Sequence, residues 1–268
     1  MKPIAQFPVQ QLKNIRYLLT DIDDTLTRDG LLPAASLYAM EQLSAAGIAV
    51  VPITGRPAGW CDHIARMWPV NAVVGENGAF YFSYDRKKRR MHQVFAKNDK
   101  ERGEDRRRLE KIRQRIHQEV PGAGIASDQN YRIADLAIDF CEDVSPLPED
   151  EVVKIVRLFE EAGATAKISS IHVNGWFGKY DKLSMTEICL QDVFGVDIHT
   201  DNATIVFMGD SPNDSPMFDF FENSVGVANV ADFDLPSPPA WITKNRSASG
   251  FKEFVDVLLG SKQFMPDI

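Results

Sequence analysis

The stretch YLLTDIDDT, residues 17–25, joins a short apolar run to a group of carboxylates. Its first half, residues 17–20, is typical of a buried strand in a parallel sheet. Asp21 and Asp23 follow directly, where the strand would open into a loop. Because open parallel sheets bind ligands at the carboxyl ends of their strands, this pair of carboxylates is a candidate chemical site.

The same order of elements continues outward from this stretch. Helical patterns are bounded by Pro33 and Gly47, and by Pro57 and Pro69, and later helices are expected around Met185 and over residues 251–259. Apolar runs between them predict strands at residues 48–53, 72–74, 79–82, 204–208, 224–227 and 240–243. Alternating strands and helices predict an α/β fold with a doubly wound, Rossmann-like parallel sheet.

Residues 85–180 interrupt this rhythm. Residues 101–119 and 149–162 predict helices, and residues 166–173 predict a strand. Apolar and polar residues alternate over 134–140, which is typical of a strand with one solvent-exposed face. We therefore predict a core domain from residues 1–84 and 181–268, with an α+β domain of residues 85–180 inserted into it.

Polar residues also follow two other predicted strands. Thr54-Gly55-Arg56 follows residues 48–53, and Gly209-Asp210-Ser211-Pro212-Asn213-Asp214 follows residues 204–208. Four carboxylates brought to one edge of a sheet would repel one another strongly in a partly buried site. They therefore imply a cation, and ligation by oxygen alone suits Mg²⁺.

Composition limits the class of protein. With 268 residues, 44% apolar and 25% charged, the chain matches ordinary globular proteins rather than disordered ones. Residues 42–55 form the longest stretch without a charged residue, too short to cross a membrane. The N-terminus lacks the apolar segment of a secretory signal, and the three cysteines show no disulfide or zinc spacing. We therefore expect a cytoplasmic protein without a membrane partner.

The net charge of −8 conceals a basic segment. Residues 86–115 hold 14 Lys or Arg and 5 Asp or Glu, which suggests nucleic-acid binding, an anionic substrate or a solvated helix. The segment contains one aromatic residue, Phe95, and pairs Glu104 with Arg108 at helical spacing. That pattern favours a solvated helix face or a field that attracts anions over nucleic-acid binding.

Asp21-Ile22-Asp23-Asp24-Thr25, Thr54-Gly55-Arg56, Lys182 and the Gly209–Asp214 segment together resemble the four ordered motifs of the haloacid dehalogenase (HAD) superfamily. The insertion and Gly75-Glu76-Asn77-Gly78-Ala79 resemble the type IIB (C2B) cap subfamily. The resemblance implies a Mg²⁺-dependent phosphatase for a small phosphorylated metabolite such as a sugar phosphate, as a monomer or small homo-oligomer. A sugar phosphomutase is the alternative.

The resemblance also implies a role for each motif residue. Asp21 would be the nucleophile and Asp23 the general acid and base, while Thr54, Gly55, Lys182 and Asn213 would bind phosphate. Lys179 is an alternative to Lys182. The metal ligands would be Asp21, the backbone carbonyl of Asp23, Asp210 and Asp214. Substrate contacts are expected from Arg56, Asn77, His172 and Asn174, and Trp176 is either a sugar contact or a core residue. Asp24 stands where many members of the subfamily have glycine.

Overall fold

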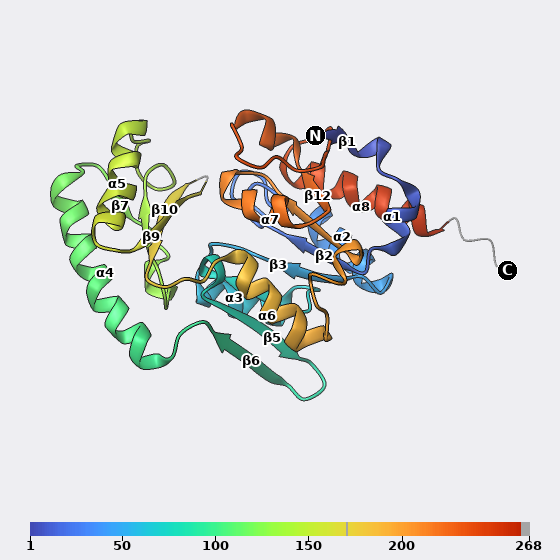
Figure 1. Cartoon of the computed structure of the whole chain (residues 1–268), viewed down its shortest axis with the longest axis horizontal. Helices are drawn as coiled ribbons and strands as arrows, with labels where there is room; N and C mark the ends of the chain where they lie inside the picture. Colours follow the sequence, from blue (N-terminus) through green and yellow to red (C-terminus); the bar gives the residue numbers. More distant parts are fainter. Residues whose placement is uncertain (170, 264–268) are drawn as a thin grey trace.

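The computed structural model describes residues 1–169 and 171–263, which form a core and a smaller domain beside it (Figure 1). The core is built on a six-stranded sheet with the order β1-β13-β12-β11-β2-β3, in which each pair of neighbours is parallel. Its strands are β1 (Lys2–Pro3), β2 (Tyr17–Thr20), β3 (Ala49–Pro52), β11 (Ile205–Gly209), β12 (Asn223–Gly226) and β13 (Trp241–Ile242). The predicted doubly wound α/β core is confirmed.

Helices cover both faces of this sheet because successive side chains of each buried strand point to opposite sides. Leu18 packs in one apolar cluster with α1, α2, α3 and α8, and Leu19 packs in the opposite cluster with α6 and α7. These helices are α1 (Val9–Asn14), α2 (Ala34–Ala45), α3 (Ala58–Met67), α6 (Lys182–Phe194), α7 (Ser215–Phe220) and α8 (Ser247–Gln263). No helix in the described part of the chain combines the length and apolarity needed to cross a bilayer.

A second sheet adjoins the core. Strands β4 (Val73–Gly75), β5 (Phe80–Asp85) and β6 (Arg90–Phe95) are antiparallel, and a parallel bridge from Ile53 to Val74 links them to the core strands. The Tyr81 hydroxyl donates to Asp192 on α6, 2.9 Å away, so β5 stays with the core. Since β6 pairs with β5, the chain leaves the core after Phe95, about ten residues later than the boundary expected at residue 85. We propose residues 97–180 as the inserted domain.

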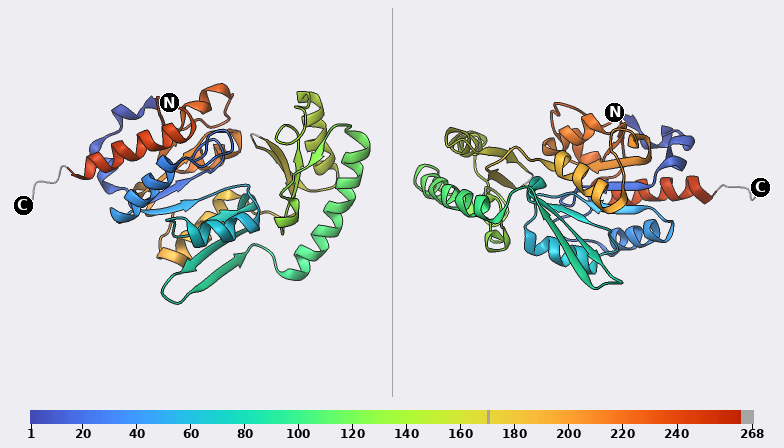
Figure 2. Two further views of the ribbon diagram at one scale, coloured as in Figure 1. Left: turned by 180° about the vertical axis from the view of Figure 1, so that it is seen from behind. Right: turned by 60° about the horizontal axis from the view of Figure 1, so that its bottom comes forward.

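The inserted domain, called the cap below, has its own sheet and core. Its antiparallel strands have the order β7-β8-β10-β9, and helices α4 and α5 pack on one face of the sheet. Figure 2 shows α4 and α5 on the side of the cap sheet that is turned away from the core. The elements are α4 (Asp99–Glu119), β7 (Gly124–Ile125), β8 (Leu136–Asp139), α5 (Glu149–Glu161), β9 (Thr165–Ile168) and β10 (His172–Trp176). Short 3₁₀ helices are η1 (Ile4–Gln6), η2 (Glu76–Gly78), η3 (Gln129–Tyr131), η4 (Asn202–Thr204), η5 (Pro212–Asp214) and η6 (Ala228–Asp232).

Two predictions for the cap are wrong in detail. Residues 166–173 were expected to form one strand, but they contain the end of β9 and the start of β10, which pair as an antiparallel hairpin. The polar face of the 134–140 segment was expected to be solvated, yet Asp135 and Asp139 are buried. This face is turned toward the core, and the polar side chains meet protein partners there instead of water. The Asp139 carboxylate, for example, accepts hydrogen bonds from three backbone N–H groups of residues 141–143.

Candidate active site

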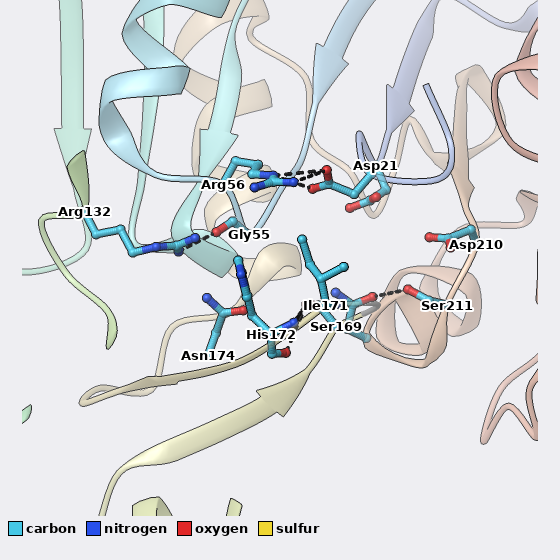
Figure 3. Close-up of a pocket in the computed structure, with 12 residues that line it drawn as sticks. Asp21, Gly55, Arg56, Arg132, Ser169, Ile171, His172, Asn174, Asp210 and Ser211 are labelled. Atoms are coloured by element: carbon cyan, nitrogen blue, oxygen red, sulfur yellow. Dashed lines mark hydrogen bonds and ion pairs between the residues drawn. The ribbon is translucent and has the colours of Figure 1, made fainter. Parts of the chain in front are cut away.

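The loops after β2, β3 and β11 meet at the carboxyl edge of the core sheet, because these three strands are adjacent and parallel. The backbone N–H of Asp21 donates to Met208 of β11, and that of Ile53 donates to Thr20 of β2. These bonds place Asp21 between the motif after β3 and the motif after β11, as Figure 3 shows for Asp21, Gly55 and Asp210. Residues far apart in the sequence therefore form one site.

Three buried carboxylates form the centre of this site. Asp21, Asp210 and Asp214 each place an oxygen within 4.8 Å of the others. Burial, together with the charge of Asp214, raises the pKa of Asp21 to about 8 in spite of Lys182. Burial and the charges of Asp21 and Asp214 also raise the pKa of Asp210 well above its usual range. A hard divalent cation would relieve this repulsion, so the donor set fits the expected metal.

Asp214 differs from the other two carboxylates in its bonds. Its Oδ1 accepts from the Lys182 ammonium at 2.8 Å, and its Oδ2 accepts from the backbone N–H of Asp210 at 3.1 Å. Both oxygens are therefore used in holding Lys182 and the loop that carries Asp210. This leaves Asp21 and Asp210 as the carboxylates with more free coordination capacity.

Lys182, not Lys179, lies at the carboxylate cluster. Its ammonium donates to Asp21 and Asp214, each at 2.8 Å, whereas Lys179 is exposed. Burial works against the charge of Lys182, but the two carboxylates outweigh it and raise the pKa. Lys182 begins α6, whose N-terminus is capped by the Asp181 side chain. Gly78 fits under this turn: a Cβ there would lie 1.9 Å from the Asp181 carbonyl oxygen.

The predicted phosphate ligands surround Asp21 at different depths. Thr54 is fully buried, and its hydroxyl oxygen accepts from the backbone N–H of Arg56 at 3.0 Å, which leaves its proton free to donate. Gly55 and Asn213 line the cavity itself, and the Asn213 side chain accepts from the Ser211 hydroxyl. Asn77 is buried beside Gly55 and does not line the cavity; its Nδ2 has no hydrogen-bond partner among the described residues.

Arg56, expected to contact substrate, is held by carboxylates. Its Nε and Nη2 donate to both oxygens of Asp23 at 2.9–3.1 Å, as the dashed lines in Figure 3 show. The same guanidinium reaches Asp128 and Glu142 of the cap at 3.5 and 3.1 Å. Arg56 therefore joins the candidate acid–base residue to the cap.

The cap contributes a polar wall to the cavity. His172 and Asn174 on β10 are buried and line it with Arg132, Ser169 and Ile171. Asn174 donates to Asp135 at 3.0 Å, and His172 Nε2 lies 2.9 Å from a Glu142 oxygen. Trp176 is a core residue: it is buried, stacks on Tyr180 and donates its indole N–H to the Tyr180 carbonyl.

The side chains of Glu76 and Arg132 also join the core to the cap, and the sequence motifs predict neither contact. The Glu76 carboxylate accepts from four backbone N–H groups, that of Ala58 in the core and those of residues 133–135 in the cap. Arg132 of the cap donates to the Gly55 carbonyl at 2.8 Å and pairs with Asp128 and Asp135. Glu76 lies inside the quoted Gly75–Ala79 segment, but nothing in the sequence near it indicates partners almost 60 residues away.

These contacts hold the cap closely against the core. The cavity between them has a volume of about 20 Å³, which is room for one or two water molecules. A phosphate ester does not fit in that volume. The cap and the core are therefore in a closed arrangement in this structure.

Comparison with known proteins supports the motifs and the fold. Residues 18–102 match the family model of the haloacid dehalogenase-like hydrolases. A search of curated proteins by sequence found no match. Among solved structures, a protein of Thermoplasma acidophilum has a TM-score of 0.69 and 18% identity, covering 91% of this chain and 98% of its own.

Two other solved structures are phosphatases or related to them. The sucrose-phosphatase of Synechocystis, solved with sucrose and phosphate, has a TM-score of 0.62 and 15% identity, covering 92% of this chain and 98% of its own. A trehalose-6-phosphate phosphatase related protein has a TM-score of 0.62 and 14% identity, covering 92% of this chain and 99% of its own. Residues 18–102 are therefore similar to haloacid dehalogenase-like hydrolases, and the core and cap together share the fold of these solved structures.

Proposed function

We propose that this protein is a Mg²⁺-dependent phosphatase that hydrolyses a small phosphorylated metabolite, a sugar phosphate, through an aspartyl-phosphate intermediate. The observation that carries the proposal is the contact of Asp21 with Lys182 inside a buried carboxylate cluster, at the edge where Asp23 and Thr54 also lie. A carboxylate held beside an ammonium and a metal site can approach an anionic phosphate, because both cations offset the repulsion.

In the first step, a carboxylate oxygen of Asp21 attacks phosphorus as the bond to the leaving oxygen breaks. The carboxyl proton of Asp23 passes to that oxygen, so an alcohol leaves and Asp23 becomes a carboxylate. Lys182 and the Thr54 hydroxyl donate hydrogen bonds to the phosphoryl oxygens as negative charge shifts onto them. Asp21, Asp210 and the Asp23 carbonyl, with Asp214 in support, would hold Mg²⁺, which would supply further positive charge at the phosphoryl group.

In the second step, Asp23 takes a proton from water. The resulting hydroxide oxygen bonds to phosphorus, the bond to Asp21 breaks, and inorganic phosphate leaves. Asp23 is then protonated again and Asp21 is a carboxylate, so both residues return to their starting forms. Dividing one difficult displacement into two in this way is how nucleophilic catalysis by a carboxylate lowers the barrier.

The cap supports a sugar as the alcohol. His172, Asn174, Ser169 and Arg132 offer hydrogen-bonding groups to the cavity, with Ile171 as the apolar side chain among the cap residues that line it. Hydroxyl groups of a sugar suit such a wall, because each can donate and accept a hydrogen bond. Two of the structures similar to this chain are a sucrose-phosphatase, solved with sucrose and phosphate, and a protein related to trehalose-6-phosphate phosphatase.

Replacement of the nucleophile tests the proposal. Asp21→Asn removes the attacking charge with little change in shape, so we expect turnover of hexose phosphates to fall below about a thousandth of wild type. Asp29→Asn is the control, because Asp29 is an exposed carboxylate eight positions later. Phosphate release would be measured with a panel of phosphorylated metabolites and without a bisphosphate activator. Substantial turnover by the Asp21→Asn enzyme contradicts the assignment, and a requirement for bisphosphate indicates a mutase.

A further inference from the structure

A chain of side-chain contacts runs from the candidate acid–base residue of the core into the cap. Asp23 is held by Arg56, Arg56 by Glu142, and Glu142 lies 2.9 Å from His172 in the wall of the cavity. The first two residues belong to the core and the last two to the cap. These contacts therefore link the candidate acid–base residue, Asp23, to the cap.

The geometry at Arg56 is that of a fixed fork. Nε and Nη2 contact both oxygens of Asp23, an arrangement that sets the plane of the carboxylate as well as its position. The guanidinium also stacks on the Trp60 ring, 4.5 Å from its centre. Only 6% of the Arg56 side chain is exposed, compared with 25% for Asp23, so Arg56 is the more constrained partner.

The cap supplies two of the three carboxylates around Arg56. Glu142 contacts the same Nη2 that contacts Asp23, and Asp128 lies 3.5 Å from Nη1 on the other side of the fork. Asp128 is itself held by Arg132, which reaches back to Gly55. A cap that moved away from the core would take both of these carboxylates from Arg56 at once. The hydrogen bonds of the guanidinium would then be reduced to those with Asp23, with Trp60 still stacked on it.

We propose that Arg56 is a positioning residue that holds Asp23 in its proton-transfer orientation when the cap is closed, and that Glu142 and Asp128 transmit closure to it. The inference rests on the proposed phosphatase function. Proton transfer would then be available only after the substrate is enclosed. Because His172 contacts Glu142 and faces the cavity, a substrate group that moves His172 would act on the same contacts.

The leaving group provides the test. Departure of an alcohol requires a proton from Asp23, whereas departure of a nitrophenolate does not, because that anion is already stable in water. Misplacing Asp23 should therefore reduce kcat/KM for an alkyl phosphate much more than for p-nitrophenyl phosphate. General acid catalysis contributes about 10²–10⁴-fold, so a partial loss of positioning should cost about tenfold or more for the alkyl ester.

The experiment compares Glu142→Gln and Arg56→Lys with wild type on glucose 6-phosphate and p-nitrophenyl phosphate. Glu142→Gln keeps the shape of the side chain and removes its charge; Arg56→Lys keeps the charge and removes the fork. Asp143→Asn is the matched control, because Asp143 is an exposed carboxylate on the same loop and is not among the residues that contact Arg56. We expect both variants, but not the control, to lower the alkyl-to-aryl ratio of kcat/KM by about tenfold.

The possible results separate this inference from the proposed function. Equal losses on both esters mean that Glu142 and Arg56 act only on cap closure or stability, which overturns the inference. An unchanged ratio with unchanged rates overturns it as well. Hydrolysis of neither ester by the wild-type protein contradicts the proposed function, and with it the inference that rests on it.

Discussion

Lys182 is the residue on which the charge balance of the cluster depends. It is the shared partner of Asp21 and Asp214, and all three side chains are buried. Removing one member of a buried ion pair leaves uncompensated charge, at a cost of about 3–5 kcal/mol. Replacing Lys182 should therefore lower the stability of the protein as well as its activity.

We predict that Lys182→Met lowers the free energy of unfolding of the metal-free protein by about 3 kcal/mol and also greatly reduces turnover. Lys179→Met is the control, since Lys179 is exposed three residues earlier. Urea unfolding in EDTA would measure the first effect and phosphate release the second. If both variants behaved alike, Lys182 would not have the role described.

At the level of single residues, the motifs predicted which side chains meet. Asp21, Thr54 and Asp210 come together because they follow the adjacent strands β2, β3 and β11, and Lys182 reaches Asp21 from the first turn of α6. The sequence could not show that Arg56 would be paired inside the protein, because its partners Asp128 and Glu142 are on loops of another domain. It also left open why Asp24 replaces glycine; its φ of 54° is left-handed, a conformation that Asp tolerates better than most residues.

At the level of elements, the start of α6 is fixed by the loop that contains Gly78. The φ of Gly78 is +102°, and its Cα lies against the Asp181 carbonyl. A side chain at this position would push the N-terminus of α6 away and move Lys182 with it.

We predict that Gly78→Ala reduces both stability and turnover, because the new Cβ collides with backbone that cannot yield cheaply. Gly103→Ala is the control: Gly103 lies within α4 with open space around it, so the change should stabilise the protein by up to about 1 kcal/mol. Thermal unfolding and phosphate release would show the contrast. Normal turnover by Gly78→Ala would contradict the proposed role of the η2 loop.

Some elements had weak sequence signals. Strand β6 is mostly polar and partly exposed, so it lacks the apolar run that identified the core strands. Between the end of β9 at Ile168 and the start of β10 at His172, the sequence has no Gly, Pro, Asn or Asp to separate two strands, and its serines are weaker turn formers. By contrast, α4 and α5 were predicted closely because each carries an apolar stripe at helical spacing.

At the level of the whole molecule, charged and polar contacts of Arg56, Glu76 and Arg132 help to hold the cap to the core, and the ionisable groups among them make this docking sensitive to pH. Hydrogen bonding to His172 and the charge of Arg56 lower the pKa of Glu142 to about 2. At a pH between the pKa of Glu142 in the folded protein and its pKa in the unfolded chain, the unfolded chain binds a proton at this carboxylate more readily. The free energy of unfolding therefore falls as the pH decreases from about 4.5 to 2.

We predict that Glu142→Gln removes part of this acid sensitivity. Because Glu142 is partly exposed, its contribution should be no more than about 1 kcal/mol. Unfolding free energies would be compared at pH 6 and pH 3 for wild type, Glu142→Gln and Asp143→Asn. An identical pH dependence in wild type and Glu142→Gln would show that this ion pair does not contribute to docking.

The buried cluster of Asp21, Asp210 and Asp214 should also make the stability of the protein depend on Mg²⁺. Mg²⁺ that binds the folded protein stabilises it by about 2.7 kcal/mol at a hundred times its Kd, which corresponds to a rise in Tm of several degrees for a chain of this size. EDTA should reverse the shift and abolish turnover. Asp210→Asn should lose the shift, while Asp234→Asn, an exposed carboxylate, should keep it. A shift that persists in Asp210→Asn would place the metal elsewhere.

The position of β2 in the sheet has a consequence for how the protein is made. Strand β2 lies between β3, which follows it closely, and β11, which begins at Ile205. During synthesis from the N-terminus, Asp21 therefore emerges long before Asp210 and Asp214 can reach it, whereas the whole cap is complete by then. The catalytic edge is assembled only when the last quarter of the chain returns to the first, so a chain that ends before β11 leaves one edge of β2 without a partner.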